Sequence, residues 1–419
     1  MKKAFLVLWL IAMVCSAQAQ IPNAPLKFTE FFKANQTDSI YNLFTAKMKR
    51  AINIEGTKQL LGQLKSQLGE VNNVREMESK VNGLSEFRLS FERPIVEIAL
   101  IVDKDSIAGI LQKAVQTNKE DSSQTDSPDN FTVDNSIGKL HGTLTLPKDK
   151  KKVPVVLMIG GSGPTDRNMN QGQELRTNSF QLLAKGLAEN GIASLRYDKR
   201  GVGKSRGAAN ASSLTLDNFI NDAKLFMNKL ASDDRFSDVI ILGHSEGAAI
   251  GLITSLQTKP DAYISLCGFK NDMLTLMGEQ FKPILTPEDF KVFTELADSL
   301  KAGKIVNRTL PAALSPIFTP KSQAFLISTL QYNPSKEIKK LKIPILIIGG
   351  STDLQVSAEA ATELAKASKT AILKIIPQMN HVLKKASSDR LSNIATYNNQ
   401  SLTLHEEVVP ILTGFIKNH

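Results

Sequence analysis

Cysteine is scarce in this sequence of 419 residues, which contains only Cys15 and Cys267. We expect Cys15 to be removed with an N-terminal leader, which leaves one cysteine and therefore no intramolecular disulfide. Cys267 ends the apolar run that starts at Tyr263, a pattern typical of a buried strand residue and not of a reactive thiol.

Long apolar runs are absent beyond the N-terminus, so the sequence predicts no membrane-spanning helix and no stable membrane insertion. At the N-terminus, Lys2 and Lys3 precede an apolar stretch and an Ala-x-Ala site that ends at Ala19. This pattern predicts a secretory signal peptide over residues 1–19 and a secreted or periplasmic protein. Bulky residues precede Cys15 where a lipoprotein signal has small ones, which disfavours lipidation.

The sequence also lacks a strong concentration of charge of one sign. There are 51 basic and 41 acidic residues, which gives a net charge of +10. A basic surplus can mark a surface for nucleic acid or membranes, but here the lysines are spread along the chain. We interpret the densest run, Lys148 with Lys150 to Lys152, as a solvated loop and not as a patch for an anionic partner, and we expect no nucleic-acid partner.

The length favours two domains, one of them large. Residues 20–115 combine apolar positions at helical spacing with strand-like runs at 87–91 and 95–102, which predicts a small α+β domain. Residues 116–130 contain no apolar side chain and are interpreted as an interdomain linker. The remaining residues, 131–419, form the second predicted domain.

The second domain shows the pattern of a mostly parallel sheet with helices on both faces. An alternating stretch at 131–146 predicts an antiparallel pair at one edge. Short apolar runs separated by helical patterns then follow at 153–159, 192–197, 239–242, 262–266, 343–348 and 371–376. Such runs are typical of parallel strands buried on both faces, and a helical segment at about 269–337 predicts a lid inserted between the sixth and seventh strands.

One motif of this domain is typical of a catalytic serine. The strand at 239–242 runs into Gly243-His244-Ser245-Glu246-Gly247, and an Ala- and Gly-rich helix follows. The turn is so tight that small residues must flank the serine, and the helix N-terminus directs free N–H groups at a developing negative charge. We therefore expect Ser245 to be a nucleophile.

A nucleophilic serine needs a general base and a group that orients that base, both supplied by later strands. Asp353 follows the apolar run at 343–348, and His381 follows the run at 371–376. Of the five histidines, His381 alone follows a strand in the required order. We expect Asp353 and His381 to complete a Ser-His-Asp triad with Ser245.

The loop after the first parallel strand is the candidate for stabilising an oxyanion. It contains Gly160-Gly161-Ser162-Gly163, and its glycines let the backbone approach a substrate oxygen closely. We expect the donors to be the backbone N–H groups of Ser162 and Glu246, with Gly161 as the neighbouring alternative to Ser162.

A second glycine motif, Gly201 to Ser205, resembles the end of a phosphate-binding loop. That loop requires a glycine five residues before its Gly-Lys pair, where this sequence has Asp198. We therefore interpret the Tyr197-to-Gly201 segment as a turn that supports the neighbouring loops, and not as a nucleotide site.

Taken together, these motifs resemble the α/β-hydrolase superfamily, in particular its esterase and serine-aminopeptidase-like branch. Five motifs of that branch are present, at residues 161–167, 197–205, 243–247, 350–353 and 380–381. The resemblance covers residues from about 131 to the C-terminus, with Gly160 standing where many relatives have a histidine. The N-terminal unit resembles, more weakly, a small domain of unknown function often found ahead of such hydrolases.

The resemblance and the triad imply a serine hydrolase that cleaves carboxylic esters through an acyl-enzyme. The expected partner is a small-molecule acyl ester or amide, and the chemistry calls for no metal or organic cofactor. An aminopeptidase or an acyltransferase of the same fold shares every motif and stays open. The alternative from another class is a catalytically silent binding protein, which an intact triad disfavours.

Overall fold

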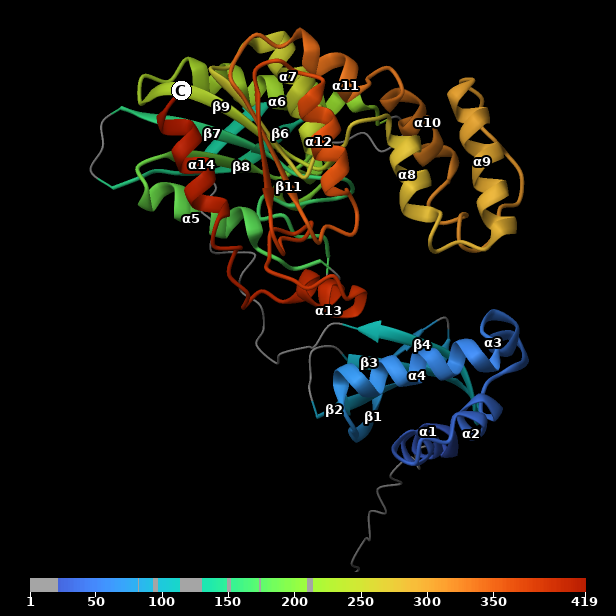
Figure 1. The fold of residues 1–419 in the computed structure, drawn as a ribbon. Coiled ribbons are helices and arrows are strands. Elements are labelled where there is room, and N and C mark those ends of the chain that lie inside the picture. Colours follow the sequence, from blue (N-terminus) through green and yellow to red (C-terminus); the bar gives the residue numbers. More distant parts are fainter. Residues whose placement is uncertain are drawn as a thin grey trace, which may run out of the picture. The chain divides into compact units, whose positions relative to one another are not determined.

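A computed structural model describes residues 22–81, 83–92, 97–113, 130–148, 152–172, 175–208 and 214–419. The chain divides into two compact units, residues 1–117 and residues 118–419 (Figure 1). The predicted signal peptide at 1–19 and all but the last residue of the predicted linker at 116–130 lie outside the described residues.

The small unit packs four helices against one antiparallel sheet of order β1-β2-β3-β4. Its helices are α1 (Asn23–Lys33), α2 (Thr37–Asn42), α3 (Ala46–Ala51) and α4 (Ile54–Leu68). Its strands are β1 (Val71–Val81), β2 (Leu84–Phe91), β3 (Glu97–Asp103) and β4 (Ser106–Lys113). Phe28 and Phe32 of α1 and Phe87 and Leu89 of β2 are fully or almost fully buried in the core between these layers. The predicted α+β unit is confirmed, although β1 was not predicted.

The large unit is built on one sheet of eight strands in the order β12-β11-β10-β9-β7-β8-β6-β5. The strands are β5 (Phe131–Asp134), β6 (Lys139–Thr145), β7 (Val153–Ile159), β8 (Ala193–Tyr197), β9 (Phe236–His244), β10 (Ala262–Leu266), β11 (Ile345–Gly350) and β12 (Ala371–Ile376). β6 is antiparallel to both β5 and β8, and the other neighbouring strands are parallel. The carboxyl ends of β7 to β12 therefore all lie at one edge of the sheet.

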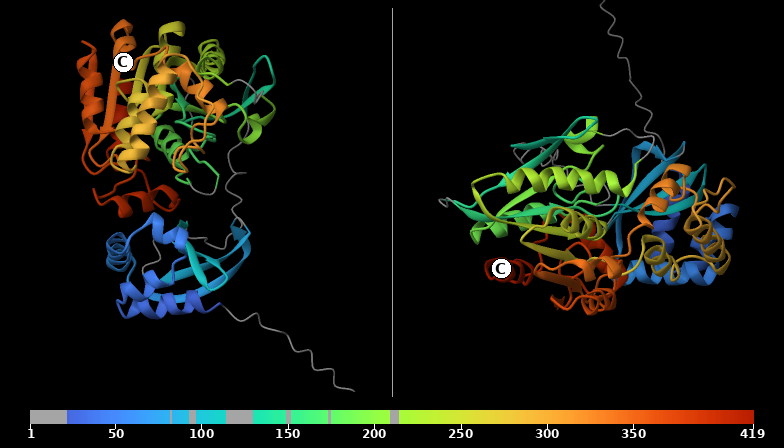
Figure 2. Two further views of the ribbon diagram at one scale, coloured as in Figure 1. Left: turned by 90° about the vertical axis from the view of Figure 1, so that its right-hand side faces the viewer. Right: turned by 90° about the horizontal axis from the view of Figure 1, so that it is seen from above.

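Helices cover both faces of this sheet (Figures 1 and 2). One apolar cluster contains side chains of α5 (Ser179–Glu189) and α14 (Val408–Lys417). The other contains side chains of α6 (Leu216–Ala231), α7 (Glu246–Thr258) and α12 (Ala358–Lys366). Alternate residues of β7 face the two clusters, as expected for a parallel strand buried on both faces. The predicted α/β-hydrolase sheet is confirmed.

A helical insertion lies between β10 and β11, the sixth and seventh strands of this unit. It comprises α8 (Met273–Phe281), α9 (Pro287–Lys301), α10 (Pro320–Thr329), α11 (Pro334–Glu337) and the 3-10 turn η3 (Ile338–Lys340). The N-termini of α9 and α10 are capped by the threonines that precede their first prolines. Phe293, Leu296 and Phe318 belong to a separate apolar cluster. Short helical turns also follow β8 and β12: η2 (Gly203–Ala208), α13 (Arg390–Ala395) and η4 (Thr396–Asn398).

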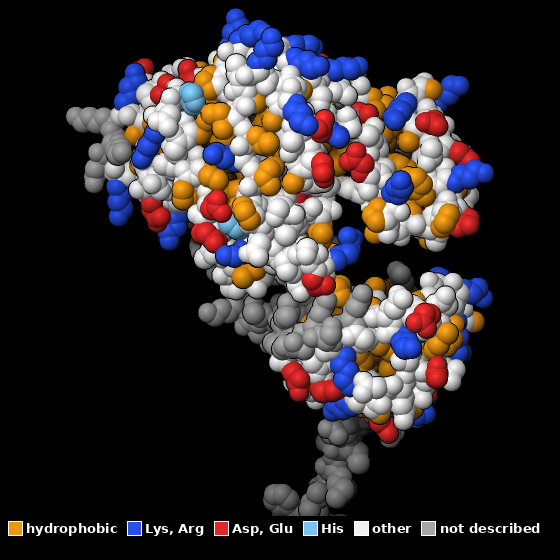
Figure 3. Space-filling model, viewed as in Figure 1, with side chains coloured by type: hydrophobic (Ala, Val, Ile, Leu, Met, Phe, Trp, Pro, Cys, Tyr) orange, Lys and Arg blue, Asp and Glu red, His pale blue; other side chains and the backbone are white. Residues whose placement is uncertain are grey.

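On the face drawn in Figure 3, Lys and Arg side chains gather along the edge of the large unit at the top of the view. Over the rest of that face, on both units, they are interspersed with Asp and Glu. In the part of the chain that the structure describes, every helix is too short or too polar to cross a bilayer.

Candidate functional site

Ser245 lies in the turn between β9 and α7. Its φ and ψ are 54° and −120°, a left-handed conformation that is strained for a residue with a side chain. Its N–H donates to the Leu266 carbonyl at 3.0 Å, which anchors the turn to the end of β10. The residue is 8% exposed. The turn thus presents a serine at the carboxyl edge of the sheet in a conformation that the surrounding structure enforces.

The two glycines of the Gly-x-Ser-x-Gly motif are required by close backbone contacts. A Cβ atom on Gly243 would lie 2.0 Å from the Gly247 carbonyl oxygen. A Cβ atom on Gly247 would lie 2.2 Å from the Ile159 carbonyl oxygen at the end of β7. Because neither distance is possible for a side chain, the strand, the turn and α7 can only approach each other with glycine at both positions.

Asp353 and His381 meet directly, although 28 residues separate them. Asp353 follows β11, His381 follows β12, and His381 Nδ1 is 2.8 Å from Asp353 Oδ2. A carboxylate only accepts, so Nδ1 carries the proton and Nε2 is left as the basic nitrogen of the ring. The pair therefore holds His381 in the tautomer that a general base requires.

The Asp353 carboxylate is stabilised in its charged form. Its side chain is fully buried, which by itself would raise its pKa. The contact with His381 and the hydrogen bonds from the Val356 and Gln355 N–H groups outweigh burial, so the pKa of Asp353 is lower than usual. We conclude that Asp353 is ionised near neutral pH.

The loop that carries His381 is held by buried polar contacts. Asn380 is fully buried, and its side-chain amide donates to Asn393 at 3.1 Å and to Thr396 at 2.6 Å. The Ser179 hydroxyl donates to the Val382 carbonyl at 2.7 Å. These contacts on both sides of His381 limit its movement and keep it beside Asp353.

His244, the first variable residue of the motif, contacts the same loop. Its Nε2 is 2.8 Å from the His381 carbonyl oxygen, and the two rings are 4.7 Å apart. Since a carbonyl only accepts, His244 Nε2 carries a proton. Complete burial, and next the nearby His381, lower the pKa of His244 to about 3, so it stays neutral. His244 therefore ties the turn of Ser245 to the loop of His381 without adding charge.

The glycine loop after β7 packs against the same turn. A Cβ atom on Gly161 would lie 3.2 Å from Ser245 Cβ and 3.2 Å from His244 Nδ1. The next residue, Ser162, is exposed, and Glu246 is the first residue of α7, where an N–H has no acceptor within the helix. The structure thus brings the loop of Ser162 beside the start of α7, with Ser245 between them.

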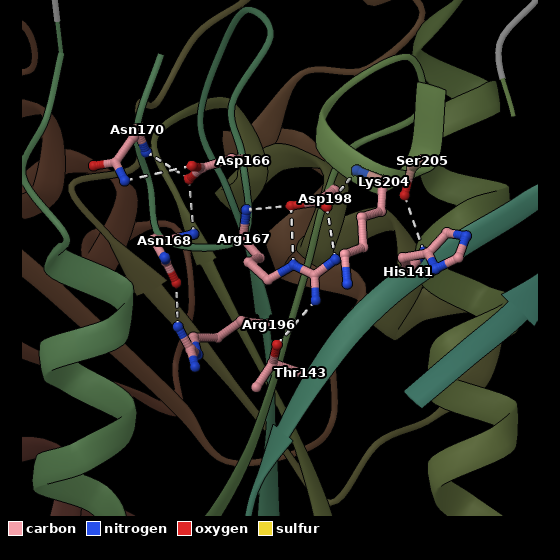
Figure 4. A network of polar contacts seen from close by, with 10 residues as sticks. All are labelled: His141, Thr143, Asp166, Arg167, Asn168, Asn170, Arg196, Asp198, Lys204 and Ser205. Carbon is pink, nitrogen blue, oxygen red and sulfur yellow. Dashed lines mark hydrogen bonds and ion pairs between the residues drawn. The ribbon is translucent and has the colours of Figure 1, made fainter. Parts of the chain in front are cut away.

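A buried polar network fixes the rest of that loop (Figure 4). Arg167 donates twice to Asp198 with its side chain, at 3.1 Å and 2.7 Å, and a third time with its backbone N–H at 2.9 Å. Arg167 also reaches Thr143 of β6, and Arg196 contacts Asn168. The network joins the loops after β7 and β8, which are the segments 161–167 and 197–205 that carry two of the resemblance motifs.

Cys267 lies one residue beyond β10, not within a strand as expected, and has a φ of 51°. Burial, and next the Asp353 carboxylate, raise its pKa well above the ordinary value. Ligand atoms of His244, Cys267 and His381 lie within 4.8 Å of one another, a spacing that could suit a metal ion. Each histidine uses one ring nitrogen in a hydrogen bond and keeps the other, but a metal needs the thiolate form of Cys267, which burial and the Asp353 carboxylate disfavour.

The motif that resembles a phosphate-binding loop serves a structural purpose. Gly203 to Ser205 lie in η2, where the Lys204 N–H donates to Asp198 and the Ser205 hydroxyl accepts from the His141 N–H. These contacts, some of them visible in Figure 4, join the turn to β6 and to the network around Asp198. This agrees with the supporting role expected from the sequence.

Sequence reasoning missed the residues that join these loops. Lys199 and the Glu246 side chain form a buried ion pair of 3.0 Å, and Lys199 also reaches the glycine loop. The sequence offered only two indications of this ion pair, an acidic residue directly after Ser245 and a lysine directly after Asp198. Neither residue type suggests burial by itself.

Comparisons with known proteins agree with the fold and the motif. The family described as serine aminopeptidase, S33 matches residues 172–274, which include the turn of Ser245. Esterase EstD of Thermotoga maritima is 24% identical over 390 residues, which cover 90% of this chain and 91% of that protein. This match is longer than residues 118–419 and therefore reaches into the small unit.

Solved structures of hydrolases are also similar. Est1E from Butyrivibrio proteoclasticus is 18% identical, with a TM-score of 0.45, and the match covers 69% of this chain and 100% of that one. A proline iminopeptidase from Mycobacterium smegmatis is 15% identical, also with a TM-score of 0.45, and the match covers 69% and 98%.

Proposed function

Because this chain belongs to the α/β-hydrolase superfamily and is esterase-like in sequence, we propose that it cleaves carboxylic esters through an acyl-enzyme on Ser245. The observation that carries the proposal is the buried hydrogen bond between Asp353 and His381, at the sheet edge where Ser245 occupies its strained turn. In the proposal Ser245 is the nucleophile, His381 is the base, and the Asp353 carboxylate orients the base.

Each residue has a defined step in the proposed reaction. His381 Nε2 takes the Ser245 hydroxyl proton as the oxygen attacks the ester carbonyl, and Asp353 stabilises the imidazolium that forms. The backbone N–H groups of Ser162 and Glu246 bind the tetrahedral oxyanion, which contributes about 3–4 kcal/mol for a donor of this kind. His381 then protonates the leaving alcohol, and water releases the acyl group by the same path in reverse.

Esters are favoured over peptide amines as substrates. An aminopeptidase needs acidic groups that hold a free α-amino group, and the insertion offers Glu279, Glu288, Asp289, Glu295 and Asp298. All but the half-buried Asp289 are exposed to solvent, and Glu295 pairs with Arg308 at 2.9 Å. The relative that matches across the chain is named an esterase, whereas the matching family is described as an aminopeptidase. The aminopeptidase is therefore the second candidate.

The test compares Ser245→Ala with Ser255→Ala. Ser255 lies on the same helix and is buried, and its hydroxyl donates to the Gly251 carbonyl. We expect Ser245→Ala to lose hydrolysis of p-nitrophenyl acyl esters and labelling by a fluorophosphonate, and Ser255→Ala to keep both. Aminoacyl amides are measured beside the esters. Activity of Ser245→Ala near that of the wild type would contradict the proposal, and a preference for the amides would favour the aminopeptidase.

We also propose that the protein is exported, on the basis of its N-terminal sequence. Lys2 and Lys3, the apolar stretch and the Ala17-to-Ala19 site support cleavage after Ala19. Expression of the full chain followed by mass spectrometry of the purified protein tests this proposal, because the mature chain should begin at Gln20. An intact N-terminus in a cell-associated protein would contradict it.

A further inference from the structure

Lys199 is a buried ammonium group between the two loops proposed to bind the oxyanion. It lies in the turn after β8 and is 3% exposed. Its Nζ donates to the Gly161 carbonyl at 2.9 Å and to Glu246 Oε1 at 3.0 Å, and it lies 4.5 Å from the centre of the Phe219 ring. An ammonium has three protons, and these three partners account for all of them.

The contact with Gly161 controls the direction of a neighbouring N–H. The Gly161 carbonyl and the Ser162 N–H belong to one planar trans peptide, so they point in opposite directions. Lys199 holds the carbonyl oxygen at 2.9 Å together with the Thr165 hydroxyl at 3.2 Å, so the Ser162 N–H is directed to the other side. A charged donor forms a stronger hydrogen bond than a neutral one, so this peptide is held firmly in one orientation.

Lys199 also contacts the side chain of Glu246, the residue whose backbone N–H is the second proposed oxyanion donor. The Glu246 backbone N–H faces the proposed oxyanion position from the start of α7, while its buried carboxylate pairs with Lys199. An unpaired carboxylate at this point would oppose the negative charge that develops on the substrate oxygen. Lys199 therefore neutralises Glu246 and at the same time links it to the loop of Ser162.

We propose that Lys199 is a positioning residue that, with Glu246, orients the Gly161–Ser162 peptide as an oxyanion donor. The proposal rests on the proposed serine-hydrolase function and specifies how its oxyanion site is built. Lys199 does not touch the substrate. Its effect is to hold the Ser162 N–H in a fixed place relative to the start of α7, where the second proposed donor lies.

The alternative is that Lys199 and Glu246 form an ion pair that only stabilises the fold. The neighbouring pair Arg200–Asp222 provides a matched control for this alternative. This pair is about as buried as Lys199–Glu246, and its Nη2 to Oδ1 distance is 2.6 Å. It joins the turn after β8 to α6 and does not contact the glycine loop. Replacing either pair by apolar residues removes both charges together and leaves no unpaired buried charge.

The experiment compares Lys199→Met/Glu246→Met with Arg200→Met/Asp222→Leu in the full chain. Measurements are kcat and KM for a p-nitrophenyl ester, the Ki of an alkyl boronic acid that mimics the tetrahedral state, and the melting temperature. For the Lys199 pair we expect kcat to fall by about 10²- to 10³-fold, as for loss of one oxyanion donor. KM should change little, and the boronic acid Ki should rise in proportion to the loss in kcat/KM. The Arg200 pair should lower the melting temperature and leave kcat near that of the wild type.

The outcomes separate this proposal from the proposed function. If the wild type is active and the Lys199 pair variant keeps its kcat and its affinity for the boronic acid, the proposed role of Lys199 is wrong and the proposed function stands. The same conclusion follows if both pair variants lose activity equally. A wild type that neither hydrolyses the ester nor reacts with a fluorophosphonate overturns both proposals. If the methionine variant does not fold, Lys199→Gln/Glu246→Gln retains a neutral hydrogen-bonded pair. It should lose about tenfold in kcat, with a matching rise in Ki, and no loss would refute the proposal.

Discussion

Substitution of Gly161 by alanine tests how closely the glycine loop must approach the nucleophile. The added methyl group would lie 3.2 Å from Ser245 Cβ and 3.2 Å from His244 Nδ1. Ordinary contacts of a Cβ atom are 3.4–4 Å, so the loop and the turn must separate by a few tenths of an ångström. The neighbouring Ser162 N–H moves with the loop.

The expected effect on the rate follows from this displacement. A misplacement of about 1 Å can reduce a rate by about 10²-fold, so a shift of a few tenths should reduce kcat/KM by roughly fivefold. That loss corresponds to about 1 kcal/mol of transition-state stabilisation. Overpacking of this kind also destabilises the fold by about 1–3 kcal/mol, which a melting curve detects.

The assay measures kcat/KM for a p-nitrophenyl ester, with Gly160→Ala as the control. A Cβ atom on Gly160 would contact only the Thr165 side chain, at 3.3 Å and 3.6 Å, and would leave Ser245 untouched. We expect this control to stay within about twofold of the wild type, because the methyl group of Thr165 can yield. Equal kcat/KM values for the two variants would refute the argument that the glycine loop is placed by its contact with Ser245.

Three further predictions concern Asp353 and Cys267. Asp353→Asn should lower kcat by about 10⁴-fold in steady-state assays, because the amide no longer favours the required tautomer of His381. Since the fold lowers the pKa of Asp353, its charge contributes stability that is present above about pH 4 and is lost as the pH falls further. Urea unfolding between pH 3 and 7 should therefore show a smaller acid-induced loss in Asp353→Asn than in the wild type, and equal losses would contradict this. Burial and the raised pKa of Cys267 should prevent alkylation by iodoacetamide until the protein is unfolded, as mass spectrometry would reveal.

The main sheet and the pairing of Asp353 with His381 could be predicted because their signals are local. Each buried strand is a short apolar run, and Ser245, Asp353 and His381 each follow such a run within a few residues. Parallel strands place their carboxyl ends at one edge, so residues far apart in sequence can be assigned to one place without knowing their contacts. Strand β1 escaped prediction because Val71–Val81 is polar at most positions and its apolar residues do not alternate.

Contacts between the loops could not be predicted. His244 reaches the His381 carbonyl across 137 residues, and Lys199 reaches Gly161 and Glu246 across 38 and 47 residues. These contacts depend on the order of strands in the sheet, in which β7 lies between β8 and β9. They also require a lysine and a glutamate to be buried together, which hydropathy alone argues against.

The two variable positions of the Gly-x-Ser-x-Gly motif are held by partners elsewhere in the chain. His244 is bound to the loop of His381, and Glu246 is bound to Lys199. A mutation at 246 alone would leave a buried lysine without its counter-ion, and a mutation at 199 alone would leave a buried carboxylate. Among related chains, positions 199 and 246 should therefore change together. A relative with lysine and glutamate at these two positions is expected to have the same buried ion pair.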